Sequence, residues 1–282
     1  MIPGIDVSHH QGRIDWARVR AAGIRFAFAK ATEGDGREGY GRKAYVDPTY
    51  YRNREGAARH GIIVGSFHFC RRSKDPDYRV DALREATHLT DTIGEVLDGE
   101  LPPSMDLEWD KRTRGKRWTP SETVQWGSDF LDYTAKAVAR TPIVYGGKSF
   151  WRFKMGRSLA LARYPLWLAQ PRGLTPVHMK DLEARKKLKI NRPIEGWHPP
   201  HFWQHSHRGR VDGIKGPVDL NWFMGSSYAL EDMAKKPCDV VPIRPGADVR
   251  PPPRIETPDD PLSAQFWVWA RELFSTKPRR SA

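Results

Sequence analysis

Residues 2–32 read IPGIDVSHHQGRIDWARVRAAGIRFAFAKAT, with two short apolar segments on either side of a polar one. The apolar segments, Ile2–Ser8 and Ile24–Thr32, have the length and composition of β-strands. Asp15 is a preferred helix N-cap and Gly23 a preferred helix terminator, so we expect a helix between them. A strand, a helix and a strand in this order predict two parallel strands joined by a right-handed crossover.

The same alternation continues along most of the chain. Further strands are expected at Ile62–Phe69, Pro103–Glu108, Ile143–Tyr145, Leu166–Ala169, Phe202–His205 and Val218–Phe223. Helix starts are indicated at Asp47-Pro48, Asp75-Pro76 and Thr119-Pro120, whereas the later connections look irregular. Eight strands with helices between only the early ones predict an α/β fold, a single barrel with an incomplete helical ring.

The composition excludes several classes of protein. With 47 Lys and Arg against 34 Asp and Glu, the formal net charge is +13, which suits an anionic partner such as an envelope polymer. The basic residues are dispersed and carry no nucleic-acid-binding motif, so no nucleic acid is expected. Neither an apolar run of about 18–20 residues nor a signal-peptide pattern is present, so we expect no membrane span and no signal peptide. Two cysteines, Cys70 and Cys238, are too few for a disulfide scaffold, and no metal cluster is indicated.

The character of the chain changes after residue 230. We expect the barrel to occupy residues 1–230 and a proline-rich linker to occupy residues 231–262, because residues 237–261 contain eight prolines. Residues 263–282 are expected to form a short C-terminal helix and a basic tail. The helix has three possible roles: docking on the barrel, anchoring to an anionic envelope or membrane surface, and binding a partner.

Four acidic residues are the candidate chemical groups. Asp106 and Glu108 are two positions apart at the end of an expected strand, so their side chains point to the same face. Asp6 and Asp219 occupy matching ends of the first and last strands, which are neighbours in a closed barrel. Neighbouring carboxylates raise one another's proton affinity, so one of them can remain protonated and act as a general acid. Taken singly, each acid is equally consistent with a solvated loop residue.

Several motifs follow one another in a recognisable order. They are Gly4–Gly12 (GIDVSHHQG), Ile14–Trp16 (IDW), Phe26–Gly34 (FAFAKATEG), Gly65–Phe69 (GSFHF), Met105–Glu108 (MDLE), Pro142–Tyr145 (PIVY), Leu166–Gln170 (LWLAQ), Trp203-Gln204 and Val218–Asn221 (VDLN). Together they resemble glycoside hydrolase family 25, the Chalaropsis-type lysozymes, over roughly residues 2–224. The resemblance implies a TIM-like (β/α)5(β)3 barrel. It also implies hydrolysis of the β-1,4 bond between N-acetylmuramic acid and N-acetylglucosamine in peptidoglycan.

The same resemblance implies a role for each acid. Glu108 matches the family's general acid, which protonates the leaving oxygen. Asp106 matches its partner, which either acts on the reacting centre or orients the substrate's acetamido group. Asp6 and Asp219 match the acids that complete the cluster. No metal and no organic cofactor are expected, and the stereochemical course stays open.

Candidate substrate-binding residues lie near the expected strand ends. They are Glu33, Phe67, His68, Tyr145, Trp167, Gln170, Trp203 and Gln204. The alternative to substrate contact is a structural ion pair for Glu33 and core packing for Tyr145, Trp167 and Trp203. For His68 the choice is between hydrogen bonding in the cleft and metal ligation, and Gln170 and Gln204 are candidate hydrogen-bond partners of sugars. Phe67 stands where the family often has tyrosine, which removes a hydroxyl from the cleft.

Other readings of the sequence remain open. The basic loop Lys111–Arg117 either steers an anionic polymer into the mouth or is a solvated charged loop. The expected partner is the peptidoglycan glycan strand, with peripheral contact to an anionic envelope surface through basic loops, and the expected state is a monomer. Two alternatives compete with a muramidase: a non-catalytic glycan-binding module on the same fold, and an enzyme acting on chitin-like glycans. The biological setting, a phage endolysin or a secreted bacterial enzyme acting on the cell wall, also stays open.

Overall fold

The computed structural model describes residues 1–34, 45–71, 77–108, 118–171, 177–178, 190 and 194–235. The chain divides into two compact units, residues 1–241 and 242–282, and all described residues belong to the first. Most of the expected linker, the expected C-terminal helix at 263–282 and the basic loop Lys111–Arg117 therefore lie outside the described residues. None of the described helices is both long and apolar enough to cross a membrane.

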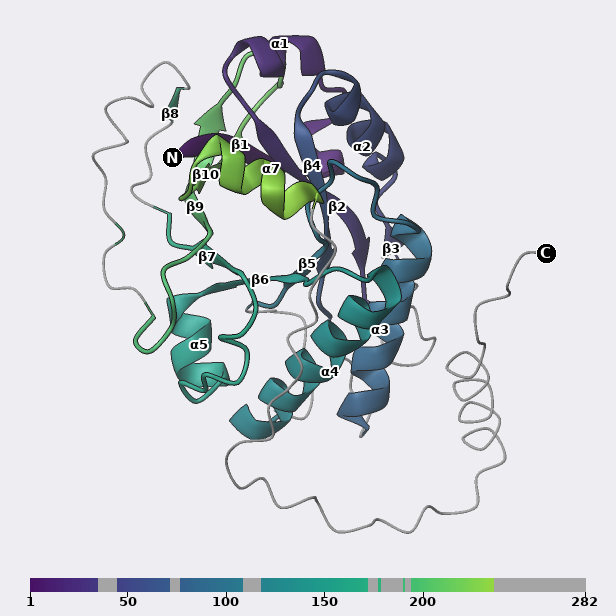
Figure 1. Ribbon diagram of the computed structural model, residues 1–282, viewed down its shortest axis with the longest axis vertical. Helices are drawn as coiled ribbons and strands as arrows, with labels where there is room; N and C mark the ends of the chain where they lie inside the picture. The colour runs from purple at the N-terminus through teal and green to yellow at the C-terminus, as the bar shows by residue number, and fades with distance from the viewer. Residues whose placement is uncertain are drawn as a thin grey trace, which may run out of the picture. The chain divides into compact units, whose positions relative to one another are not determined.

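The described strands form a closed barrel, as the sequence predicts (Figure 1). Its members are β1 (Ile2–Val7), β2 (Phe26–Glu33), β4 (Ile63–Phe69), β5 (Ser104–Asp106), β6 (Ile143–Gly147), β7 (Leu166–Ala169), β9 (Phe202–Arg210) and β10 (Val218–Phe223). Neighbours from β1 through β9 pair in parallel, whereas β10 runs antiparallel to both β9 and β1 and closes the ring. Two short strands lie outside the ring: β3 (Tyr45–Val46) pairs with β2, and β8 (Val177–His178) pairs with β9.

Helices cover the outside of the early strands (Figure 1). They are α1 (Trp16–Ala21), α2 (Tyr50–Arg59), α3 (Tyr78–Ile93), α4 (Pro120–Val138) and α5 (Lys148–Lys154). Asp15 caps α1 by accepting the backbone N–H of Arg18, and Thr119 opens α4 with a capping box to Glu122, as their positions in the sequence predict. The strand pattern alone did not predict α5, which supplies the fifth helix of the (β/α)5(β)3 arrangement.

Two helix starts differ from the sequence expectation. The Asp47 carboxylate accepts the backbone N–H and the hydroxyl of Thr49, so Asp47-Pro48 forms a turn and α2 begins two residues later. Helix α3 begins after Asp77, which caps it, whereas the expected start at Asp75-Pro76 lies outside the described residues.

Alternate side chains of each strand fill two separate cores. Inward-facing rings from six strands pack inside the barrel, where Phe28 and Trp167 stack with centroids 4.1 Å apart. Outward-facing residues such as Met105 and Leu107 belong to the outer core and lie beside Gly127 of α4. Gly4 faces inward, and a Cβ there would lie 2.3 Å from the ring of Phe26. Among the residues that the structure describes, these rings fill the barrel interior.

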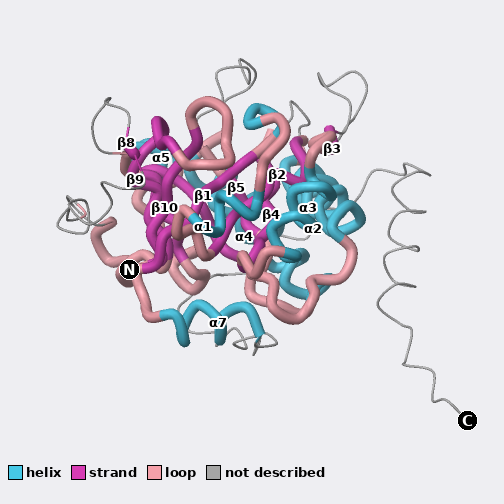
Figure 2. Tube along the Cα trace, turned by 90° about the horizontal axis from the view of Figure 1, so that it is seen from above, coloured by secondary structure: helices cyan, strands magenta, loops and turns pink. Residues whose placement is uncertain are grey.

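A short helix, α7 (Ser227–Lys235), lies across the end of the barrel where β10 finishes (Figure 2). Its Leu230 and Ala234 pack against the inner aromatic core. The buried Arg140 donates to the carbonyl oxygens of Met233 and Ala234, which are left free at the end of this helix. The helix extends to Lys235, five residues into the region we expected to be linker.

Candidate active site

Four acidic side chains meet at the other end of the barrel. Asp6 on β1 and Asp219 on β10 are direct partners in the antiparallel ladder. Asp106 is the last residue of β5, and Glu108 follows two positions later. All four line one cleft of about 520 Å³, at the end of the barrel where the parallel strands finish. The structure thus brings together the four acids that the strand pattern placed at one rim.

Two amide side chains hold the acids on β1 and β10. Gln204 Nε2 donates to Asp6 Oδ2 at 3.0 Å and to Asp219 Oδ2 at 3.3 Å. Asn221 Nδ2 also donates to Asp6 Oδ2, at 2.7 Å. These donors come from β9 and β10, so the antiparallel part of the barrel fixes both carboxyl groups.

Two inward-facing rings set the orientation of those amides. The Tyr145 hydroxyl donates to Gln204 Oε1 at 2.9 Å, and Trp167 Nε1 donates to Asn221 Oδ1 at 2.8 Å. Burial raises the pKa of Tyr145 well above its usual value, so its hydroxyl keeps its proton and remains a donor. Because each amide oxygen already accepts a bond, each NH₂ group is directed at the acids.

The cluster holds protons at neutral pH. Burial, followed by the charge of Asp219, raises the pKa of Asp6 to about 8. Burial, followed by the charge of Glu108, also raises the pKa of Asp106 well above its usual value. Asp106 Oδ1 is buried without a hydrogen-bond partner in the part of the chain that the structure describes, which further disfavours a carboxylate there. Two buried acids with raised pKa values therefore lie next to the more exposed Glu108.

Cationic side chains stand at the rim of the cleft. Lys30 lines it, and its Nζ lies 2.5 Å from Glu33 Oε2, while Arg71 Nε lies 2.7 Å from Glu33 Oε1. Burial opposes ionisation of Glu33, but the hydrogen bonds and charges of Lys30 and Arg71 prevail and lower its pKa to about 2. Glu33 is thus a permanent anion that positions two cations, and it is not among the residues that line the cleft.

Comparison with known proteins identifies the family. The model of glycosyl hydrolases family 25 matches residues 5–214. The chain belongs to this family. It is therefore a glycoside hydrolase, and its closed α/β barrel agrees with the fold of the family 25 lysozymes.

Several relatives of this family 25 chain are similar over most of its length. The uncharacterized protein YegX of Escherichia coli (strain K12) is 34% identical over 235 residues, which cover 82% of this chain and 72% of that protein. Lysozyme M1 of Streptomyces globisporus is 30% identical over 239 residues, which cover 83% of this chain and 71% of that protein. The crystal structure of a lysozyme from Streptomyces coelicolor superposes with a TM-score of 0.69 at 29% identity and covers 83% of this chain and 96% of that one.

The candidate substrate-binding residues of this family 25 chain fall into two groups, according to whether their side chains face the cleft. Phe67, Tyr145, Trp167 and Gln204 line the cleft. Trp203, next to Gln204 on β9, faces the outer core, and its Nε1 donates to the backbone carbonyl of Gln170. Trp203 is fully buried, so its assignment as a substrate-binding residue is corrected, whereas a role for the half-buried Gln170 stays a prediction.

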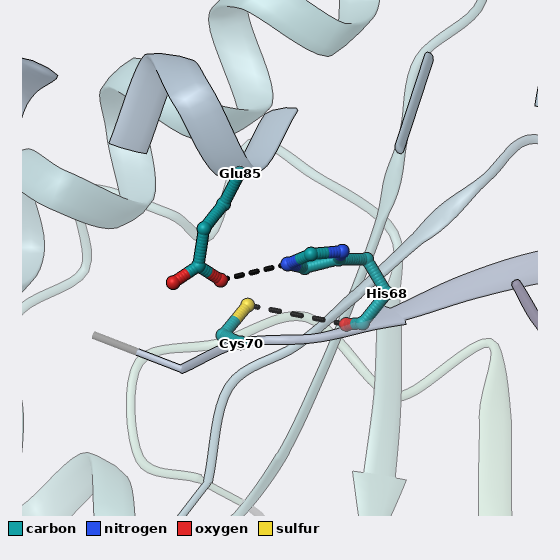
Figure 3. A group of neighbouring side chains, drawn as sticks. All are labelled: His68, Cys70 and Glu85. Atoms are coloured by element: carbon teal, nitrogen blue, oxygen red, sulfur yellow. Dashed lines mark hydrogen bonds and ion pairs between the residues drawn. The ribbon is translucent and has the colours of Figure 1, made fainter. Parts of the chain in front are cut away.

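His68 does not line the cleft, and its ring faces Glu85 instead (Figure 3). Its Nε2 lies 2.7 Å from Glu85 Oε2 on α3, its Nδ1 lies 2.7 Å from Thr32 Oγ1, and its side chain is fully buried. Its neighbour Phe67 lines the cleft, and adjacent strand residues point to opposite faces. His68 is therefore a structural link between β4 and α3, and we correct its assignment as a substrate-binding residue.

The same buried group includes Cys70, which sequence reasoning did not connect with His68 (Figure 3). Atoms of His68, Cys70 and Glu85 that are able to bind a metal lie within 4.8 Å of one another. The Glu85 carboxylate already accepts the backbone N–H of Arg71 and faces His68 Nε2. The sequence indicated no metal cluster because Glu85 is 15 residues from Cys70 on a different element. The hydrogen bonds present account for the burial of these groups.

Two further residues of the site were missed from the sequence. Asn221 is the inward-facing residue two positions after Asp219, so strand alternation was able to reveal it. His207 lines the cleft, and its Nδ1 lies 3.5 Å from Asp219 Oδ2. The hydrogen bond to Asp219 raises the pKa of His207. No sequence pattern marked His207, because the β9–β10 register shifts at this point and interrupts the alternation.

Proposed function

We propose that this family 25 enzyme is a muramidase that hydrolyses the β-1,4 bond between N-acetylmuramic acid and N-acetylglucosamine in peptidoglycan. The names of the relatives support the substrate, since Lysozyme M1 is one of them. The observation that carries the chemistry is a pair of carboxyl groups in one cleft, the buried Asp106 and the half-buried Glu108. Hydrolysis of a glycoside by paired carboxyl groups uses one group to protonate the leaving oxygen and the other to act at the reacting sugar.

In the proposed reaction Glu108 is the general acid. It is half-buried in the cleft, at the point where a glycan is able to reach it, and it protonates the leaving glycosidic oxygen. Asp106 lies deeper on the same face, and its negative charge, when ionised, favours the protonated form of Glu108. As the leaving group departs, positive charge develops on the sugar ring, and Asp106 is placed either to stabilise that charge or to orient the acetamido group.

Asp6 and Asp219 act as electrostatic partners in this proposal. They lie across the cleft on neighbouring strands and share the Gln204 amide. Because their hydrogen bonds are already arranged before substrate binds, the cluster needs little reorganisation when the ring becomes positive. The rings of Phe67, Tyr145 and Trp167 show only narrow exposed edges to the cleft, so they shape its floor and offer limited area for stacking on sugars.

The alternative of a non-catalytic glycan-binding module is disfavoured by the same cluster. Burying a carboxyl group without a hydrogen-bond partner for one of its oxygens costs stability, as Asp106 does. Binding alone gains nothing from this arrangement, whereas acid catalysis uses it.

The test is mass spectrometry of the fragments released from purified sacculi. The proposal predicts fragments with N-acetylmuramic acid at the reducing end, released by the wild type and not by Glu108→Gln. Fragments that end in N-acetylglucosamine would contradict the bond assignment. Cleavage of chitin oligosaccharides with no action on sacculi would favour the chitin-like alternative.

A further inference from the structure

A second hollow, which the catalytic proposal does not use, lies beside the cleft. Its volume is about 680 Å³, and it is formed by the loop between β1 and α1 together with the turn between β9 and β10. Arg13, Arg18 and Lys215 line it, with His60 at its edge. In the described part of the chain, the side chains of Arg13, Arg18 and Lys215 make no hydrogen bond and no ion pair, so these cations are available to a ligand.

The negative charge of the acidic residues in this hollow does not balance the positive charge of its basic residues. Two acidic residues line it, Asp15 and Asp212. Asp15 Oδ1 already accepts the backbone N–H of Arg18 as the cap of α1. The three cations therefore leave an excess of positive charge over the hollow at neutral pH.

The walls of the hollow are fixed in place. The backbone N–H of Asp15 donates to the carbonyl of Gly213 at 2.9 Å, which joins the two loops. Gly213 has φ of 95° and a Cβ there would lie 2.4 Å from the Asp15 carbonyl oxygen, so this contact requires glycine. Ile14 and Trp16 are buried and give the hollow an apolar base.

The hollow lies directly beside the catalytic cleft. Gln11 lines the cleft and Arg13 lines the hollow, only two residues later, while Lys215 lines the hollow and Pro217 lines the cleft. Gln11 Nε2 donates to the carbonyl of Pro217 at 3.2 Å, so a single hydrogen-bonded bridge separates the two. A substrate with an acidic branch on the glycan would therefore place the branch beside Arg13 and Lys215.

We propose that this hollow binds a carboxylate of the acidic peptide that is attached to each N-acetylmuramic acid of peptidoglycan. The inference rests on the proposed muramidase function. Arginine and lysine supply charge-assisted hydrogen bonds to the carboxylate, and Ile14 and Trp16 supply apolar contact to its small side chains. The hollow thus makes the enzyme prefer peptide-bearing glycan over bare glycan.

The test compares kcat/KM on three substrates. These are sacculi with intact peptides, the same sacculi with their peptide carboxylates amidated by carbodiimide chemistry, and glycan strands stripped of peptide by an amidase. The test variant is Arg18→Gln/Lys215→Gln. The control is Lys136→Gln/Lys235→Gln, which removes the same charge from exposed positions at the ends of α4 and α7.

We expect kcat/KM of the test variant to be about 3- to 10-fold lower than that of the wild type on intact sacculi and equal to it on stripped glycan. Amidation of the sacculi should lower kcat/KM of the wild type to that of the test variant and leave kcat/KM of the test variant unchanged. The reason is that amidation and the substitutions remove the same interaction. An unchanged test variant, an equal loss on stripped glycan, or an equal loss in the control would overturn the inference and leave the muramidase function standing. A wild type that cleaves none of the three substrates would overturn both.

Discussion

At the scale of single residues, burial and neighbouring charge decide how three acids in and near the cleft behave. Asp6 and Asp106 are buried and have raised pKa values, whereas Glu33, held between two cations, has a pKa lowered to about 2. A carboxyl group therefore favours its protonated form in one place and its ionised form in another. This division is what a proton-transferring site requires.

The raised pKa of Asp6 has a consequence for stability. Between about pH 4 and pH 8 the folded chain keeps a proton on Asp6 that the unfolded chain has lost, so the free energy of unfolding falls as pH rises through this window. Asp6→Asn removes this titration, and its side-chain oxygen is still able to accept from Gln204 and Asn221. We expect the variant to be about 1–4 kcal/mol more stable than the wild type at pH 8 and nearly equal at pH 4.

Urea unfolding at pH 4, 6 and 8 measures this difference. Asp91→Asn, an exposed acid on α3, is the control and should show no such trend. A difference between Asp6→Asn and the wild type that stays constant with pH, or that favours the wild type at pH 8, would contradict the assigned protonation of Asp6.

Residue identity alone also misled at two strand positions. His68 and Trp203 have side chains of the kinds that contact sugars. His68 directly follows Phe67, and Trp203 directly precedes Gln204; Phe67 and Gln204 are the members of each pair that line the cleft. Adjacent strand residues face opposite sides, so each pair has only one member in the cleft. Applying the alternation strictly predicts the correct member of both pairs, whereas His207 follows a register shift that only the structure shows.

At the scale of elements, the reversed direction of β10 completes the site. Asp219 is the second residue of β10, so a parallel β10 would place it at the far end of the barrel. Because β10 runs antiparallel to β1, its beginning lies beside Asp6. The sequence predicted the strand and its acid, but a short strand carries no signal for its direction, and only the pairing supplies it.

Helix α7 depends on a single buried arginine from another element. The side chain of Arg140 donates to the carbonyls of Glu100, Met233 and Ala234, and so links the end of α7 to the barrel. Arg140→Met should lower the free energy of unfolding by about 2–4 kcal/mol, because it leaves buried carbonyl groups without donors. Lys136→Met, at an exposed position on α4, should change it by less than about 0.5 kcal/mol.

Guanidinium unfolding of both variants, with activity assayed in parallel, measures this link. The cleft lies at the opposite end of the barrel from α7, so we expect the residual folded fraction of Arg140→Met to keep wild-type kcat/KM. A variant as stable as the wild type would show that the three hydrogen bonds do not hold α7.

At the scale of the whole molecule, the closed barrel gathers residues that are far apart in the sequence. Asp6 and Asp219 are separated by most of the chain yet are ladder partners, and the described interior rings fill the barrel beneath them. The alternating pattern of strands and helices was enough to predict the barrel, whereas the arrival of Asp219 at the acid rim depends on the direction of β10, which the pattern does not give. The buried group of His68, Cys70 and Glu85 was not predictable in the same way, because it depends on how α3 packs against β4.

The most direct test of the central claim, that Glu108 delivers the proton, is the turnover of sacculi by Glu108→Gln. The change keeps the size of the side chain and removes its transferable proton. We predict a loss in kcat of at least about 100-fold, with unchanged glycan affinity and melting temperature, while Glu231→Gln on the exposed face of α7 keeps full activity. Normal turnover by Glu108→Gln would contradict the account.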